Sequence, residues 1–212
     1  MSRQELQIVY DMDLSDLLEP ERIRCQHSVQ SKKRTLQTLA ELLGESLRSQ
    51  HLAKCEKAAE QSPEEAEKAP AKSGLSIGKK KSRKVPEKKE DDVETLTDMA
   101  ILDALISRER LGSTGLGHGV GLPHSRLSCI QEPIAAFVTL DKGVDYESTD
   151  GQAVDLVLGL LVPEKCNDEH LKILAQLARR FSDEALRTQL RDFTEPDKLY
   201  THLLSLEPVG NS

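Results

Sequence analysis

The sequence has 212 residues, enough for one domain of ordinary size plus additional sequence. Hydrophobic residues make up 37% of it, aromatic residues only 3%, and tryptophan is absent, so its core must be aliphatic. The net charge of −7 argues against nucleic acid as the main partner, because phosphate backbones attract clustered cations.

The cysteine content and the distribution of apolar residues indicate a reducing, aqueous compartment. The four cysteines form no CxxC pair, which disfavours a zinc site, and they are few for a disulfide scaffold. The N-terminus lacks the apolar core of a signal peptide, and no stretch approaches the roughly 20 apolar residues that cross a bilayer. We therefore expect a cytoplasmic protein without membrane insertion. The cysteines are Cys25, Cys55, Cys129 and Cys166.

The first 51 residues contain three short structural signals. Residues 13–18 predict a turn or short helix that ends at Pro20, and residues 23–26 predict a short strand. Ser31 is a suitable N-cap for a following helix, whose leucines recur at helical spacing. These leucines are Leu36, Leu39, Leu42, Leu43 and Leu47.

Residues 52–95 differ sharply in composition from the sequence on either side. They are rich in Lys, Glu and Asp and nearly devoid of large apolar residues, so they cannot bury enough surface to offset the entropy of ordering. We interpret them as a charged flexible linker or insertion between residues 1–51 and 96–208. The first part is also compatible with a helix extension that Pro70 would stop. The basic run at 78–84 lacks the aromatic residues that stack on bases, which favours a solvated tether.

The sequence after the linker alternates between helical and strand patterns. Thr97 is placed to cap a helix that Gly112 ends, and apolar helical stripes return at 171–181 and 196–204. Residues 134–140 read as a strand, and the apolar run 154–162 suits a central strand buried on both faces. Strands interleaved with helices predict a layered α/β domain.

A glycine-rich loop runs from Gly112 to His124. Such glycines let a backbone bring its N–H groups close to an anion. The Ser113 and Thr114 hydroxyls can donate to phosphate, and the planar fork of Arg108 can pair with it. No Gly-Lys-Ser/Thr follows the glycines and no strand precedes them, so neither a P-loop nor a dinucleotide site is indicated.

His124 follows Pro123 directly and closes this loop. A neutral imidazole keeps a lone pair near pH 7 and can act as a nucleophile toward phosphorus. A surface histidine, or one held in the core by a hydrogen bond, fits the spacing equally well. A zinc site made by His118, His124 and His170 is a third alternative, but no carboxylate spacing supports it.

Several ordered motifs resemble one known family. GSTGLGHGVGLPHSR, preceded by SRERL, resembles the phosphohistidine motif of phosphotransferase system (PTS) enzyme IIA domains of the fructose/mannitol type. The resemblance is strongest to the nitrogen-regulatory IIA proteins and extends to Ser31-Lys32-Lys33-Arg34, to residues 150–156 and 160–163, and to Glu169-His170-Leu171. It implies a mixed β-sheet flanked by helices on both sides.

The resemblance also implies residue roles. His124 matches the histidine that is phosphorylated on Nε2, and His170 matches a second histidine that hydrogen-bonds the phosphoryl group. Arg108 matches the arginine that helps hold the anionic site, and Ser113, Thr114 and Gly115 match its loop. The sequence departs from the common pattern at Ser125, where many members have Gly, at His118, where Asn is common, and in its long linker.

The function implied is phosphoryl acceptance from a histidine-phosphorylated phosphocarrier, HPr or its nitrogen-branch counterpart. No cofactor or metal is expected. The absence of a fused IIB or IIC segment and the Ser-Lys-Lys-Arg start favour a phosphorylation-dependent regulator that binds target proteins. Two alternatives stay open: a sugar-specific IIA that passes phosphate to a fructose or mannitol IIB component, and a non-catalytic interaction module.

Overall fold

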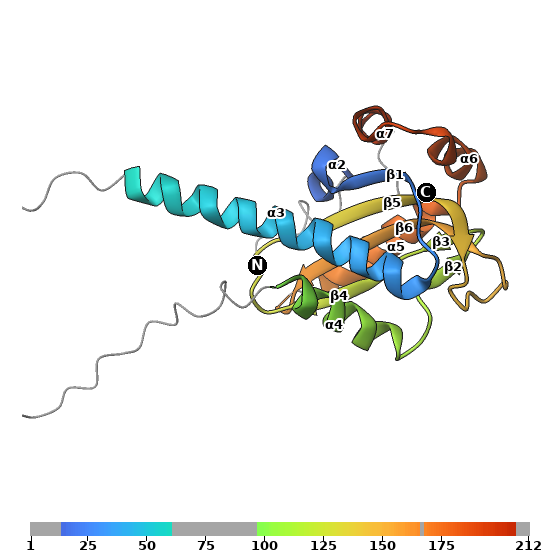
Figure 1. The fold of residues 1–212 in the computed structure, drawn as a ribbon, viewed down its shortest axis with the longest axis horizontal. Coiled ribbons are helices and arrows are strands. Elements are labelled where there is room, and N and C mark those ends of the chain that lie inside the picture. The colour runs from blue at the N-terminus through green and yellow to red at the C-terminus, as the bar shows by residue number, and fades with distance from the viewer. Residues whose placement is uncertain (1–13, 61–96, 166–167, 207–212) are drawn as a thin grey trace, which may run out of the picture.

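The computed structural model of the chain describes residues 14–60, 97–165 and 168–206 (Figure 1). A six-stranded sheet lies at the centre, and helices cover it. The elements in chain order are α2 (Leu14–Leu17), the 3-10 helix η2 (Pro20–Arg22), β1 (Ile23–His27), α3 (Lys32–Glu60), α4 (Asp98–Glu109), β2 (Gly115–Gly117), β3 (Val120–Gly121), β4 (His124–Leu127), β5 (Ile134–Val144), β6 (Val154–Pro163), α5 (Asp168–Phe181), α6 (Glu184–Asp192) and α7 (Pro196–Leu204).

The sheet mixes parallel and antiparallel pairs. The strand order is β1-β5-β6-β3-β2, and β4 also pairs with β6. Strand β5 runs antiparallel to β6 and parallel to β1, whereas β3 and β4 both run parallel to β6. Strand β6 is thus the centre of the sheet, as its continuous apolar sequence predicts.

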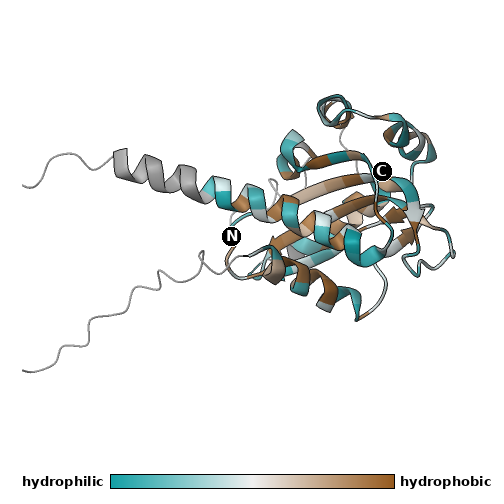
Figure 2. Cartoon of the chain, viewed as in Figure 1, coloured by the Kyte–Doolittle hydropathy of each residue, from teal (hydrophilic) through white to brown (hydrophobic). Residues whose placement is uncertain are grey.

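Each face of the sheet buries its own apolar core, so helices flank it on both sides. Successive side chains of a strand point to opposite faces, and β6 divides accordingly: Leu158 belongs to one core and Val157 to the other. Helices α2, α5, α6 and α7 complete the first core, and α3 and α4 complete the second. Figure 2 shows that the central strands are largely hydrophobic, whereas the helices around them combine hydrophobic and hydrophilic residues. The predicted α/β fold is confirmed.

A glycine in the middle of β6 lets α3 approach the sheet closely. Gly159 faces Leu39, and a Cβ at position 159 would lie 3.0 Å from Leu39 Cδ1. Both residues are in the interior, where packing density is near that of a crystal. The glycine therefore fixes how near α3, whose first residue is Lys32, comes to the strands.

The two predicted helix starts are confirmed. Ser31 Oγ accepts a hydrogen bond from Arg34 N (3.3 Å), and Thr97 Oγ1 accepts one from Ala100 N (3.2 Å). Helix α4 ends at Glu109, before the expected Gly112. Helix α3 continues to Glu60, so the boundary predicted at residue 52 falls within a helix, and the rest of the predicted linker up to residue 95 lies outside the described residues.

The sequence patterns missed β2, β3, β4 and α6. The predicted glycine loop is in part a set of short strands: β2 pairs with β3, and β3 with β6. Glycine gives no strand signal of its own, so pairing with β6 rather than local propensity defines these strands. Helix α6 has an Asp183 N-cap but only Leu186 and Leu190 as apolar buried residues, too few for a visible stripe.

None of the helices in the described ranges combines the length and apolarity needed to cross a membrane.

We predict that Gly159→Val lowers the free energy of unfolding by about 1–3 kcal/mol, because the added side chain overpacks the contact with Leu39. Urea denaturation of the two proteins measures the difference. The control, Lys142→Val, introduces valine at an exposed position of β5 and should change stability by no more than about 0.5 kcal/mol. Equal stability of Gly159→Val and the wild type would contradict the close approach of α3.

Candidate phosphoryl-transfer site

His124 is the first residue of β4 and is anchored to the centre of the sheet. Its backbone lies opposite Leu160 of β6, and Leu160 N donates to Pro123 O at 2.9 Å. The side chain is half-buried. Attachment to a strand buried on both faces gives the imidazole a rigid base.

The hydrogen bonds of His124 identify which ring nitrogen carries the proton. Nδ1 lies 2.9 Å from Leu122 O, and because a carbonyl only accepts, Nδ1 must be the donor. Nε2 lies 3.0 Å from Arg108 Nε, whose guanidinium only donates, so Nε2 accepts. The neutral ring therefore has its lone pair on Nε2, the nitrogen that the family resemblance implies as the phosphorylated one.

The surroundings of His124 favour this neutral form. Burial lowers the pKa of His124 below its usual value, and the positive charge of Arg108 and the neighbouring His170 lower it further. The Leu122 carbonyl and the Glu109 carboxylate oppose these effects. The imidazole is consequently neutral, with its lone pair present, at pH 7.

His170 lies beside His124. It belongs to the first turn of α5, its side chain is buried, and the two ring centroids are 5.6 Å apart at an interplanar angle of 52°. Burial lowers the pKa of His170, as do the charges of Arg126 and Arg108. Two neutral imidazoles thus share the site.

Arg108 lies in the last turn of α4, and its side chain contacts His124. Its Nε donates to His124 Nε2, and its Nη1 donates to Gly112 O at 3.1 Å. The guanidinium therefore lies against Nε2, the ring nitrogen with the lone pair, where it could pair with an anionic group bound to that nitrogen. The structure brings together His124, His170 and Arg108 from three separate elements.

The Ser113 and Thr114 hydroxyls, predicted to line the phosphate site, donate to protein acceptors in this structure, and their role toward phosphate stays a prediction. Ser113 Oγ donates to Tyr146 O at 2.6 Å and accepts from Gly115 N at 3.1 Å. The buried Thr114 donates its hydroxyl to Glu109 at 2.5 Å. A hydroxyl has one proton to donate, so in this arrangement neither has a donor left for phosphate.

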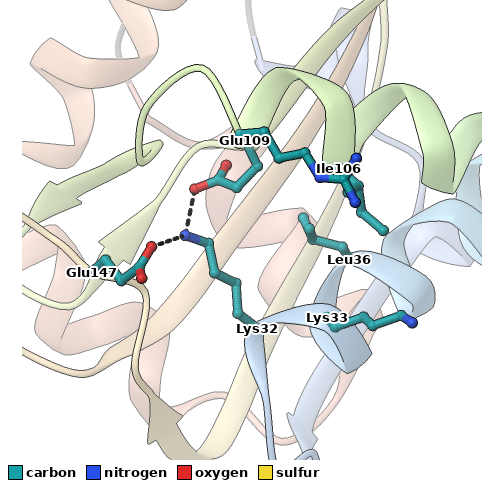
Figure 3. Close-up of a pocket in the computed structure, with 7 residues that line it drawn as sticks. Lys32, Lys33, Leu36, Ile106, Glu109 and Glu147 are labelled. Carbon is teal, nitrogen blue, oxygen red and sulfur yellow. Dashed lines mark ion pairs between the residues drawn. The ribbon is translucent and has the colours of Figure 1, made fainter.

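Glu109 is a structural carboxylate, not the solvent-facing charge that its place on α4 suggests. Its side chain is only 8% exposed, and it accepts from both Thr114 N and Thr114 Oγ1. Lys32 Nζ lies 2.7 Å from it and also donates to Tyr146 O at 2.9 Å. Figure 3 shows Lys32 between Glu109 and Glu147. This network ties the starts of α3 and β2 to the end of α4.

A cleft of about 370 Å³ lies beside this network (Figure 3). Leu36 and Ile106 supply apolar lining, while Lys33 and Arg110 add positive charge. None of His124, His170 and Arg108 lines this cleft, although Glu109, which does, follows Arg108 directly in the sequence.

His118 does not join the other histidines as a hydrogen-bonded member of the site. It is exposed between β2 and β3, at a φ of 56°, with its N–H donating to Asp150 Oδ2 and its carbonyl accepting from Arg191. In the described parts of the chain, no group of three or more His, Cys, Asp or Glu residues is arranged to hold a metal ion.

Arg126 is the site residue that sequence reasoning missed. It lies two residues after His124 on β4, so both side chains project from the same face of the strand, and its Nη2 is 3.1 Å from His170 Nδ1. The two-residue spacing of Arg126 and His124 would have placed both side chains on one face, but only if the four-residue strand β4 had been predicted.

Comparison with known proteins identifies the chain as a component of the phosphotransferase system. The family model of the phosphoenolpyruvate-dependent sugar phosphotransferase system, EIIA 2, matches residues 88–205. The chain belongs to this PTS EIIA type-2 family, which confirms the resemblance seen in the sequence.

Known proteins of two branches resemble the chain. A nitrogen regulatory protein of Pseudomonas aeruginosa is 42% identical over 107 residues, which cover 50% of this chain and 70% of the relative. A PTS system fructose-specific EIIA component of Haloferax volcanii is 34% identical over 116 residues, 50% of this chain and 75% of the relative. The crystal structure of nitrogen regulatory protein IIA-Ntr from Neisseria meningitidis matches with a TM-score of 0.63 and 26% identity, over 90% of this chain and 98% of that one.

We predict that Arg108→Met raises the pKa of His124, because the positive charge that disfavours imidazolium is removed. NMR titration of the histidine ring resonances measures this. Arg110→Met removes an exposed charge two residues away and should leave the His124 titration nearly unchanged. A His124 pKa that is unchanged or lower in Arg108→Met would contradict the contact.

We predict that Lys32→Met lowers the free energy of unfolding by roughly 1–3 kcal/mol, because it leaves the Glu109 charge without its cation in a largely buried place. Chemical denaturation measures the loss. Lys33→Met, at the exposed neighbouring position, is the matched control and should have an effect within about 0.5 kcal/mol. If the two variants are equally stable, the network does not stabilise the fold.

Proposed function

We propose that His124 accepts a phosphoryl group on Nε2 from a histidine-phosphorylated phosphocarrier protein, HPr or its nitrogen-branch counterpart. The observation that carries this proposal is the ring geometry: Nδ1 donates to Leu122 O, and the Nε2 lone pair faces the guanidinium of Arg108. A nucleophilic lone pair next to a fixed cation suits attack on an anionic phosphorus centre.

In the transfer step the Nε2 lone pair of His124 forms the new N–P bond while the N–P bond of the donor breaks. The bonding electrons of the old bond return to the donor imidazole. Nδ1 of His124 keeps its proton, so the ring becomes positively charged, and the Leu122 carbonyl that accepts this N–H stabilises that charge. No proton or cofactor needs to enter the step, and catalysis is positioning and charge stabilisation.

Arg108 has a different partner before and after transfer in this proposal. In the resting site its Nε–H occupies the Nε2 lone pair, so it must leave that nitrogen as the phosphoryl group arrives. A short movement lets the same fork donate to phosphoryl oxygens. His170, whose ring centroid lies 5.6 Å from that of His124, supplies a second donor to the phosphoryl group.

The surface around the site suits docking of another protein. Leu171 follows His170 and is 61% exposed, and Leu111 lies near the Arg108 end of α4 and is 85% exposed. We propose that these two side chains form part of the surface that the phosphocarrier contacts. Phosphorylation adds about −1.5 to −2 charges at this surface, which is sufficient to change which proteins bind it.

We favour a regulatory output, in which the phosphorylated and unphosphorylated forms bind target proteins differently. The nitrogen regulatory relatives and the IIA-Ntr structure support this choice. The fructose-specific relative supports the alternative of transfer onto a IIB component. Incubating the phosphorylated protein with purified fructose and mannitol IIB proteins separates the two, because rapid transfer onto IIB would exclude a purely regulatory role.

We predict that the radiolabelled phosphocarrier labels the wild-type chain and that His124→Gln abolishes labelling, because the amide has no nucleophilic ring nitrogen. Gel autoradiography at neutral pH measures the label. His118→Asn is the matched control: Asn tolerates the positive φ at this exposed position, so labelling should be retained. Absence of label from the wild type would leave the non-catalytic interaction module as the better description.

A further inference from the structure

Arg126 contacts His170, whereas the hydrogen bonds of the His124 ring are with Arg108 and Leu122 O. Its Nη2 lies 3.1 Å from His170 Nδ1, and its side chain reaches there from an exposed position on β4. Strand β4 is anchored to β6 along its whole length, from His124 opposite Leu160 to Leu127 opposite Pro163. The guanidinium thus approaches the ring from a firm support.

This contact has only one protonation pattern. A guanidinium donates and never accepts, so His170 Nδ1 must offer its lone pair, and the proton of the neutral ring is on Nε2. Burial, and then the positive charges of Arg126 and Arg108, lower the pKa of His170 and so disfavour a second proton on the imidazole at neutral pH. The His170 ring is left with a single donor, Nε2–H. Its centroid lies 5.6 Å from the centroid of the His124 ring.

We propose that Arg126 is a positioning residue, which holds the His170 ring so that its Nε2–H is the donor for a phosphoryl group on His124. This inference rests on the proposed function. It assigns Arg126 no contact with the phosphoryl group: Arg126 acts through His170, as a partner of an active-site histidine often fixes the tautomer and orientation of its ring.

Among the described residues, Arg126 is the hydrogen-bond partner that orients the His170 ring. It engages Nδ1 alone, whereas His124 is held from both nitrogens by Leu122 O and Arg108. Loss of the Arg126 donor should therefore free the His170 ring to rotate and to move its proton to Nδ1.

The first test uses the unphosphorylated protein, so it does not depend on phosphoryl transfer. Long-range ¹H–¹⁵N NMR of histidine-labelled protein should show neutral His170 protonated on Nε2 alone in the wild type. In Arg126→Met, which removes every donor, we expect a higher His170 pKa and a population protonated on Nδ1. Arg126→Lys keeps a cationic donor and should restore the wild-type pattern. Arg34→Met, an exposed arginine on α3 that contacts Gln37, is the matched control.

The second test is a double-mutant cycle on the rate of phosphorylation of His124. As a single substitution, Arg126→Met should slow transfer by about fivefold or more, which is in the range that coupled residues of one hydrogen-bond network show. In a protein that already carries His170→Ala, it should slow transfer no further. An equal slowing in both backgrounds would overturn the proposal, because Arg126 would then act on the phosphoryl group or the docking partner directly.

The outcomes separate this inference from the proposed function. A His170 pKa and proton position that are unchanged in Arg126→Met would overturn the inference, whatever the phosphorylation rate. If instead His170 responds as expected but the wild type takes up no phosphate, the proposed function fails and the Arg126–His170 contact stands.

Discussion

Strand β6 is the element on which both the fold and the site depend. It pairs with β5 on one edge and with β3 and β4 on the other, and its residues are almost entirely buried between two layers of helices. Burial on both faces is possible because the strand carries no charged residue except Asp155 near its start. The helices on the two faces, and through β4 the histidine of the site, take their positions from this one strand.

The site combines groups of different mobility. His124 and Arg126 come from β4 and share its anchorage on the central strand, whereas Arg108 and His170 come from the last turn of one helix and the first turn of another. Helix ends open at lower free energy than central strands. The proposed nucleophile, His124, is therefore held by the central strands, while Arg108, which changes partner in the proposed transfer, lies at a helix end. The Lys32–Glu109 pair limits that freedom by tying the end of α4 to α3.

The sequence predicts the parts of this structure whose signals are local. The apolar run 154–162, the caps Ser31 and Thr97 and the long helices could be inferred because propensity and periodicity decide them. The short strands could not, because their pairing with β6 is a tertiary effect. The same holds for the hydroxyls of Ser113 and Thr114, whose partners lie on other elements, and for Arg126, whose role depends on where α5 begins. Similarity to the family located His124, Arg108 and His170, but only the hydrogen bonds assign the ring protons.

The hydrogen bond from Arg108 to His124 also determines how the idle protein reacts with its surroundings. A lone pair that accepts an N–H bond from a cation is shielded from transition-metal ions and from small electrophiles, which must displace the guanidinium and approach against its charge. The docked protein donor of the proposed transfer would offset this cost with its contact energy, whereas a diffusing reagent has no such contacts. If the proposed transfer occurs, the Arg108–His124 hydrogen bond thus favours a macromolecular donor over small reagents.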